Sequence, residues 1–306
     1  MALVIGIDGG GSKTTAALSD GTSVLGACTA AGCNINTAGV EAANLALTSA
    51  VQGALAPAGI SAESVSGVCA GVAGAASPEV AAKLAGMLAA LLPRAAVRIV
   101  GDTLIALESD FQGGPGVVCI SGTGSIAFGR NERGETARAG GWGRLVSDEG
   151  SGTWIGLRAI SECLHALDMG RSSGLVTSVM HHWQIATREQ LVFHCNREQI
   201  PNFADVFPLV EESSEAGDPL ASEILAAAGT SLARVAQIVL RRLWVGQSPV
   251  EMALTGGVFA NSGRLRQVFC NVIRSERPEV SIRLSQREPY MGAIYLAQRS
   301  LVDKSR

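Results

Sequence analysis

Two glycine-rich turns, each directly after a short apolar run, are the feature that most limits how this chain can fold. They are IDGGGSKT at residues 7–14 and ISGTGS at residues 120–125. Such a turn leaves backbone N–H groups facing outward, and glycine carries no side chain that would block an approaching phosphate. One such turn is a weak signal and could be an ordinary hairpin turn. Two of them predict a duplicated domain that holds the phosphates of one nucleotide from both sides.

The residues around the two turns predict an internal repeat. Each half of the chain begins with three strand-like runs joined by hairpin turns, and then alternates helices with strands. In the first half we expect strands at 3–8, 14–18, 24–29, 65–70 and 97–100, and helices at 39–56, 78–92 and 103–110. In the second half we expect strands at 117–120, 126–129, 135–138, 252–254 and 280–284, and helices at 151–167, 220–244, 260–274 and 290–302. This pattern predicts an α/β fold of two similar domains, with an insertion at 170–219.

Two better-known phosphate motifs do not fit. Gly6 to Gly11 has the spacing of a P-loop, but Ser12 stands where a P-loop requires lysine. A P-loop must also lead into a helix, and residues 14–18 read as a strand. Residues 122–127 match the loose dinucleotide pattern GxGxxA, which needs a following helix as well. Residues 126–138 instead predict a hairpin.

Composition excludes several classes of protein. Only 17% of the 306 residues are charged and the net charge is −3, which argues against disorder and against broad binding to nucleic acid or anionic membranes. Residues 1–8 read as a buried strand rather than a signal peptide, and the uncharged run 42–62 is broken by Pro57 and Gly59. The seven cysteines form no CxxC pair, as expected for free thiols in a reducing cytoplasm.

The turns themselves supply the candidate nucleotide ligands. Backbone amides of Gly9, Gly10, Gly11, Gly122 and Gly124 could face phosphate, with Ser12, Thr14, Thr123 and Ser125 adding hydroxyls and Lys13 a positive charge. Asp8 ends the strand before the first turn, where a carboxylate suits a Mg²⁺ ion bound through water. The alternative for Asp8 is a cap on its own turn.

These motifs resemble those of the actin, hexokinase and heat-shock chaperone ATPase superfamily. The two turns are similar to its two phosphate loops, and LTGGVFAN at 254–261 is similar to its adenosine motif, which includes Gly256, Gly257 and Asn261. The resemblance implies two ribonuclease H-like domains with ATP in the cleft between them. It places the domains at 1–115 and 116–288, and a terminal helix, 289–306, packing back on the first domain.

A closer resemblance is to the N-acetylglucosamine kinase family. It rests on GGWGRLVSDEGS at 140–151, on Gly101-Asp102-Thr103 and on the second phosphate turn. The same group contains ATPase activators of benzoyl-CoA reductase and 2-hydroxyacyl-CoA dehydratase. Those activators hold an iron–sulfur cluster between subunits through cysteines, and this chain shows no matching cysteine pair.

The resemblance also assigns roles to individual residues. Asp102 matches the general base, although it could also cap the helix expected at 103. Asn34, with Asn36 as its rival, matches a sugar-binding asparagine, and Gly71 is expected to line the cleft through its backbone. Trp142 and Asp148 match residues that contact the sugar or shape its pocket. A core tryptophan and a helix-capping aspartate are the alternatives for these two.

The implied activity is transfer of phosphate from ATP to the 6-hydroxyl of N-acetylglucosamine, with Mg²⁺ as the metal. Alternatives are a kinase for glucosamine or N-acetylmuramate, and an ATPase activator of a CoA-ester reductase or dehydratase. The expected partners are ATP and a small amino sugar in the cytoplasm, without nucleic acid or membrane. The resemblance also allows a homodimer, for which the sequence names no interface.

Overall fold

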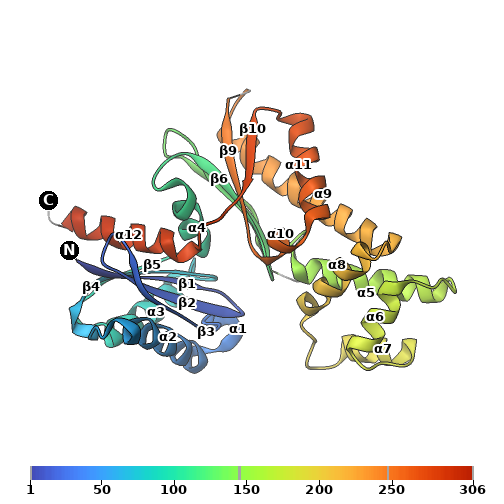
Figure 1. Cartoon of the computed structure of the whole chain (residues 1–306), viewed down its shortest axis with the longest axis horizontal. Helices are drawn as coiled ribbons and strands as arrows, with labels where there is room; N and C mark the ends of the chain where they lie inside the picture. Colours follow the sequence, from blue (N-terminus) through green and yellow to red (C-terminus); the bar gives the residue numbers. More distant parts are fainter. Residues whose placement is uncertain (1, 144–145, 247, 305–306) are drawn as a thin grey trace. The chain divides into compact units, whose positions relative to one another are not determined.

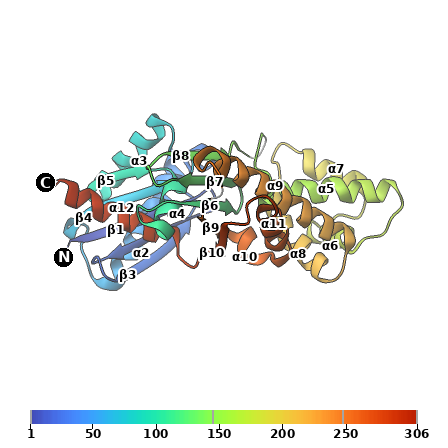
Figure 2. The same cartoon turned by 90° about the horizontal axis from the view of Figure 1, so that it is seen from above.

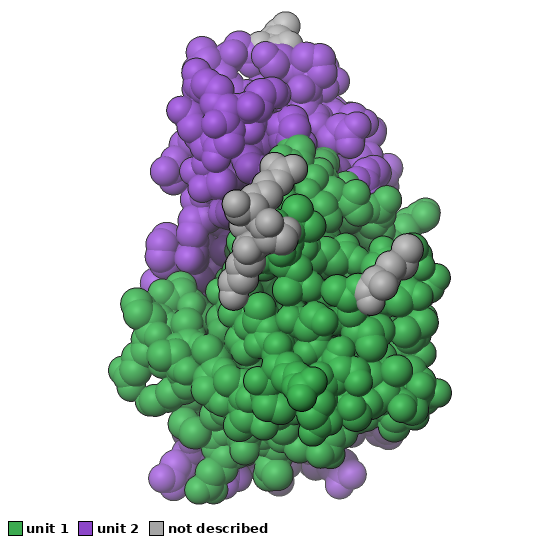
Figure 3. All heavy atoms as spheres, turned by 90° about the vertical axis from the view of Figure 1, so that its left-hand side faces the viewer, with its two compact units in different colours: residues 1–114, 285–306 green, residues 115–284 purple. Residues whose placement is uncertain are grey.

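The chain folds into two compact units. The structure is a computed structural model, and it describes residues 2–143, 146–246 and 248–304. Unit 1 consists of Met1–Gly114 together with Ser285–Arg306, and unit 2 of Pro115–Leu284 (Figure 3). Unit 1 is therefore built from both ends of the chain.

Unit 1 is a mixed five-stranded sheet in the order β3-β2-β1-β4-β5. The strands β1, β2 and β3 form antiparallel hairpins, whereas β1, β4 and β5 run parallel. The strands are β1 Leu3–Gly9, β2 Lys13–Ser19, β3 Val24–Ala31, β4 Val65–Val72 and β5 Ala96–Val100. The helices are α1 Ile35–Ala38, α2 Val40–Leu55, α3 Pro78–Leu91, α4 Asp102–Phe111 and α12 Pro289–Lys304, with short 3-10 turns at Ala56–Ala58 and Ala62–Ser64.

Both faces of this sheet are covered because side chains alternate along β1. Ile5 and Ile7 are fully buried in a cluster with residues of α2 and α3. Val4, which precedes Ile5 and faces the other side of the sheet, packs in a second cluster with residues of α4 and α12. The last helix thus closes the face that the N-terminal hairpins leave open (Figures 1 and 2).

Unit 2 repeats this topology. Its sheet order is β10-β9-β6-β7-β8, which read backwards gives the third, second, first, fourth and fifth strand, as in unit 1. The strands are β6 Gly116–Ser121, β7 Ser125–Arg130, β8 Thr136–Gly140, β9 Val250–Thr255 and β10 Val280–Leu284. Every parallel and antiparallel pairing also matches its counterpart. The predicted repeat and the predicted α/β class are confirmed.

The helices of unit 2 include a group within 170–219, the segment that was predicted only as an insertion. They are α5 Gly152–Asp168, α6 Gly174–His182, α7 Arg188–Asn196, α8 Phe207–Glu215, α9 Pro219–Leu243, α10 Gly257–Asn261 and α11 Gly263–Glu276, with a 3-10 turn at Phe203–Val206. The segment 170–219 is thus largely helical. The helix expected at 260–274 is two helices, because Ser262 ends α10 and caps α11 by accepting a hydrogen bond from Leu265 N at 3.2 Å.

Helix α9 forms the centre of the unit 2 core. It packs across β7 and β8, and more than half of its most apolar stretch is buried. Among the described helices it alone is long and apolar enough, by length and composition, to span a membrane. Its buried residues, from Ala221 to Leu243, belong to the same cluster as Val117 and Ala127 of the sheet. Helix α9 is therefore a core helix.

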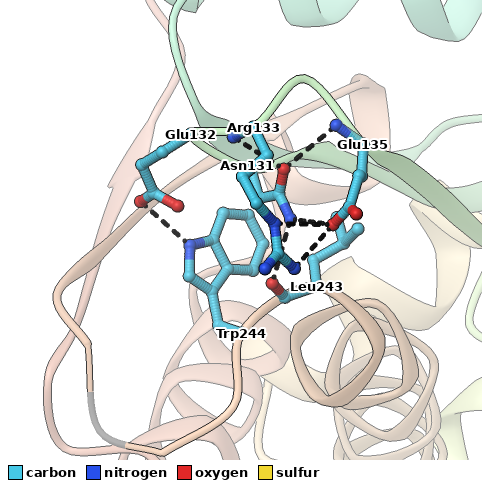
Figure 4. A network of polar contacts seen from close by, with 6 residues as sticks. All are labelled: Asn131, Glu132, Arg133, Glu135, Leu243 and Trp244. Carbon is cyan, nitrogen blue, oxygen red and sulfur yellow. Dashed lines mark hydrogen bonds and ion pairs between the residues drawn. The ribbon is translucent and has the colours of Figure 1, made fainter.

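A polar network ties the β7–β8 hairpin to the end of α9 (Figure 4). Asn131 is buried, and its side chain donates to Glu135 Oε2 at 2.7 Å and to the carbonyl oxygen of Leu243 at 3.3 Å. Its Oδ1 accepts from the backbone N–H groups of Arg133 and Glu135, both at 3.0 Å. One amide side chain thus fixes the turn of the hairpin that leads to Trp142.

Candidate functional site

Acidic side chains lie at the carboxyl ends of two parallel strands of unit 1. Asp8, Gly71 and Val100 lie side by side across β1, β4 and β5, and Asp102 comes two residues after Val100. The carboxyl edge of parallel strands is where α/β proteins bind ligands. Asp102 is the first residue of α4 and accepts a hydrogen bond from Thr103 N at 2.9 Å, while Gly101 occupies the N-cap position.

The carboxylates at this edge influence one another. Burial and then the neighbouring charge of Asp102 raise the pKa of Asp8 to about 6, with a smaller contribution from Glu288, while Lys13 lowers it. Like charges held close together in a partly buried place favour the binding of a cation. Among the described residues no cluster of three or more His, Cys, Asp or Glu side chains could hold a metal by itself. A Mg²⁺ ion at Asp8 would therefore be completed by water and phosphate oxygens.

The first turn is packed against the loop that contains the two candidate asparagines. Gly10 N donates to Lys13 O at 2.8 Å, and Asn34 N donates to Gly10 O at 3.3 Å. Asn34 Oδ1 accepts from Asn36 N at 3.0 Å and caps α1. A Cβ added at Gly74 would lie 2.6 Å from Asn36 Nδ2 and 3.2 Å from Asn34 Oδ1. Asn34 thus lies between the first turn and the Gly74 loop, and Asn36 lies against the same loop.

In unit 2 the second turn is held by the segment 147–153. Gly152 N donates to Gly122 O at 2.8 Å, and Thr153 Oγ1 donates to Thr123 O at 2.8 Å. Ser125 Oγ donates to Glu149 O at 2.9 Å. The sequence assigned the turn and this segment to different ligands, and the structure shows that they form one assembly.

Asp148 belongs to the same assembly. Its Oδ1 is 3.5 Å from Ser125 N, and a Cβ at Gly124 would lie 3.3 Å from its Oδ2. Burial raises its pKa. It does not cap the following helix, because Ser151 does so by accepting from Trp154 N at 3.1 Å. Capping of α5 therefore does not explain why Asp148 lies beside the second turn.

Trp142 is a surface residue rather than a core residue. It is 61% exposed, and the guanidinium carbon of Arg138 lies 4.3 Å from the centre of its ring. Its backbone N–H donates to Ser147 O at 3.1 Å. Two residues of the predicted 140–151 motif, Arg144 and Leu145, fall outside the described residues.

The glycines of the three motifs are needed for different physical reasons. A Cβ at Gly9 would lie 2.5 Å from Cys33 Sγ, and one at Gly256 would lie 2.3 Å from Ser121 O. Gly256 also has a positive φ of 100°. These two glycines are needed by the protein's own packing. In the same way Gly71 faces Ile105, whose Cδ1 would lie 2.5 Å from an added Cβ.

One glycine in each motif is not required by the fold. Among the described residues, a Cβ would meet nothing within 4 Å at Gly122 or Gly257, and at Gly11 only Thr37 Oγ1, at 3.9 Å. None of the three has a positive φ. Neither packing nor backbone conformation therefore excludes a side chain at these positions. Close approach of a ligand to the backbone is a physical reason for glycine at all three.

Side-chain exposure separates the remaining candidates. Thr14 and Ser125 are buried, so their hydroxyls are turned into the protein. Ser12, Lys13 and Thr123 are exposed and lie on the outer side of the turns. The exposed Asn261 folds its Nδ2 back onto Gly257 O at 2.8 Å.

Three features of the site had no clear sequence signal. Glu288 comes from the far end of the chain, and Gly32 follows β3, where a Cβ would lie 2.1 Å from Gly11 O. Arg138 stands in β8 with nothing in its spacing to connect it to Trp142. All three depend on contacts that arise only once the sheets have formed.

Comparison with known proteins places this chain in a family. Residues 5–297 match the model of the BadF/BadG/BcrA/BcrD ATPase family. The chain is 32% identical over 302 residues to an N-acetylmuramic acid/N-acetylglucosamine kinase of Clostridium acetobutylicum, which covers 97% of this chain and 99% of the relative.

Solved structures show the same architecture. A Chromobacterium violaceum protein provisionally assigned as an N-acetylglucosamine kinase superposes with a TM-score of 0.80 at 25% identity, covering 97% of this chain and 99% of that one. A Streptomyces griseus ROK family glucokinase, solved with glucose and AMPPNP, shares the fold at a TM-score of 0.64 and 16% identity, covering 97% of this chain and 100% of that one. The resemblance predicted from residues 140–151 is confirmed, and the chain belongs to the BadF/BadG/BcrA/BcrD ATPase family.

Proposed function

We propose that this chain is an ATP-dependent amino-sugar kinase that phosphorylates N-acetylglucosamine at its 6-hydroxyl. The observation that carries the proposal is Asp102, which begins α4 just after β5 and lies close enough to Asp8 to raise its pKa. Asp8 in turn comes directly before the phosphate-type turn that contains Lys13. A kinase needs this combination, a carboxylate for the attacking hydroxyl close to groups that can hold phosphate and metal. The kinase relative at 32% identity, matched along almost its whole length, supports the same assignment.

The nucleotide is proposed to bind through backbone groups. Each of the two turns donates N–H groups to phosphate oxygens, and Gly11 and Gly122 let those oxygens approach closely. Gly257, at the start of α10, does the same for the nucleoside. The exposed Lys13 and the partly buried Asp8 fit a Mg²⁺–phosphate group, in which the ion, when bound, would neutralise charge on the phosphates.

Asp102 is proposed to act as the general base. Its carboxylate, already oriented by the hydrogen bond from Thr103 N, accepts the proton of the sugar hydroxyl as that oxygen attacks the terminal phosphorus of ATP. Most of the rate enhancement comes from holding the two substrates in line.

Candidate contacts for the acceptor are proposed in each unit by itself. In unit 1 Asn34 or Asn36 offers an amide to a sugar hydroxyl or to the acetamido group. In unit 2 Asp148 accepts hydroxyl protons, and the exposed indole of Trp142 packs on the C–H face of the sugar. N-acetylmuramate is a second acceptor to test, because the Clostridium acetobutylicum relative is named for both sugars.

We further expect a cytoplasmic enzyme, because ATP and the reducing conditions that keep its seven cysteines as free thiols occur there. A homodimer and the absence of nucleic-acid and membrane partners stay predictions.

A sugar panel tests the proposal. ADP release is measured with ATP, Mg²⁺ and N-acetylglucosamine, N-acetylmuramate, glucosamine or glucose. We expect strong stimulation by N-acetylglucosamine, and a loss of about 10²-fold or more in turnover in Asp102→Asn with ATP binding retained. Asp20→Asn is the matched control, because Asp20 caps an exposed turn of the same unit. Turnover that no sugar stimulates would refute the kinase assignment.

A further inference from the structure

We propose that Arg138 is a positioning residue that holds the indole of Trp142 in place as a platform for the sugar. The inference rests on the proposed function in one respect, that Trp142 contacts the acceptor. It adds a residue outside the glycine-rich motif, and it explains how an exposed aromatic ring on a glycine-rich segment is kept in one orientation.

The backbone around Trp142 cannot fix the ring by itself. Gly140, Gly141 and Gly143 have positive φ values of 71°, 69° and 100°. Such glycines lose much conformational freedom when they are ordered, so a segment rich in them needs outside contacts to stay in one conformation. The backbone contacts described for this stretch include the bridge between Gly143 and Ser147 and the bond from Trp142 N to Ser147 O.

Arg138 supplies such contacts. Its Nη2 donates to Gly140 O at 3.2 Å and to Gly141 O at 3.0 Å, the two carbonyls immediately before Trp142. Its guanidinium carbon lies 4.3 Å from the centre of the Trp142 ring, within the range of a cation–π contact. A single planar group therefore fixes both the backbone before the tryptophan and the tryptophan ring.

The backbone of Arg138 is itself held by a neighbouring helix. Its carbonyl oxygen accepts a hydrogen bond from Arg242 Nη1, near the end of α9, at 3.3 Å. Its strand, β8, follows the hairpin turn that Asn131 ties to Leu243. The guanidinium thus projects from a strand that is held at both of these points onto a glycine-rich segment.

One atom of Arg138 is poorly accommodated. Its Nε is buried and has no hydrogen-bond partner in the part of the chain that the structure describes. A buried N–H without a partner costs stability, and arginine is a poor choice for stability alone at such a position. A role in orienting Trp142 accounts for this arrangement.

With the guanidinium on one face, most of the indole surface stays exposed to solvent. Rings held in this way lose little freedom on binding, which lowers the cost of stacking on a sugar. Loss of Arg138 should therefore weaken sugar binding more than it affects ATP.

The test compares Arg138→Ala and Arg138→Lys with Arg133→Ala. Arg133 is the matched control, because it lies in the same hairpin and pairs with the exposed Glu135. We expect the KM for N-acetylglucosamine to rise about tenfold in Arg138→Ala, in line with a cation–π contact of ~1–2 kcal/mol. The KM for ATP should stay within about twofold, and Arg138→Lys should restore part of the sugar affinity because it keeps the charge near the ring.

A second readout does not need turnover. The near-ultraviolet circular dichroism of Trp142 is obtained as the difference between each protein and the same protein carrying Trp142→Phe. We expect this signal to be strong in the wild type, lost in Arg138→Ala and unchanged in Arg133→Ala. If Arg138→Ala does not fold, the comparison is made with Arg138→Lys. We then expect the Trp142 circular dichroism signal to be weaker than in the wild type.

The inference is overturned if the Trp142 signal survives removal of the guanidinium, or if the KM values for sugar and ATP rise together. A wild type that phosphorylates no sugar would remove the proposed function but leave the circular dichroism comparison valid. The two failures can therefore be told apart.

Discussion

The contact between α12 and α4 gives the strongest prediction about the stability of unit 1. Gly292 of α12 is buried where the two helices approach most closely. A Cβ added there would lie 1.9 Å from Ile105 O and 2.5 Å from Ser109 N. Non-bonded heavy atoms normally stay about 3.5 Å apart or more, so in Gly292→Ala the helices must separate by roughly 1.5 Å.

That separation should be costly because α12 also covers the sheet. Ala293, Ile294, Leu296 and Ala297 of α12 share one buried cluster with Val4 of β1. Overpacking a core costs about 1–3 kcal/mol, and we expect Gly292→Ala to lie at the upper end, ~3 kcal/mol. At about 2–4 °C per kcal/mol, the midpoint of thermal unfolding should fall by roughly 6–12 °C.

The matched control is Gly86→Ala in α3. Gly86 is exposed within a helix, and an added Cβ would meet no atom of a described residue within 4 Å. The same substitution should therefore stabilise the protein by about 0.5–1 kcal/mol. Thermal and urea unfolding, followed by circular dichroism, measure both variants. Equal stability of Gly292→Ala and the wild type would refute the close helix contact.

Three further predictions concern the nucleotide, the metal and the hairpin. Gly122→Ala and Gly257→Ala should leave the melting temperature unchanged, because no described atom lies near the new Cβ. Both variants should raise the KM for ATP about tenfold, and an unchanged KM would argue against ligand contact at these glycines. Removing divalent cations with EDTA should abolish phosphate transfer, and added Mg²⁺ should restore it; transfer that persists would exclude a metal requirement. Asn131→Ala should cost about 2–4 kcal/mol in urea unfolding, because the carbonyl oxygen of the buried Leu243 and the turn groups in Figure 4 lose their bonds to the amide; a smaller loss would mean that water replaces them.

The sheets were predictable because their signals are local. Alternating apolar residues, glycine turns and the Asp20–Gly21 hairpin define the first strands of each half without any long-range information. The helices of 170–219 were left unassigned, although Thr187 and Gln190 form a capping box that a closer reading could have used. The division of α10 from α11 likewise depends on one local residue, Ser262.

The site was predictable only in part. Asp8 and Asp102 could be named because each follows a strand, and strand ends meet at one edge of a parallel sheet. Sequence alone could not show which glycines serve packing and which leave room for a ligand, because Gly256 meets Ser121 only after β6 and β9 have paired. The same holds for Glu288 and Arg138, whose partners are fixed by tertiary structure.

The identity of the phosphorylated product tests the central claim most directly. The protein is incubated with ATP, Mg²⁺ and N-acetylglucosamine, and the product is analysed by phosphorus NMR coupled to the sugar protons. The account predicts a phosphomonoester on the oxygen of carbon 6, formed in step with ADP and lost in Asp102→Asn. ADP formed together with free phosphate, with no phosphorylated sugar, would contradict it.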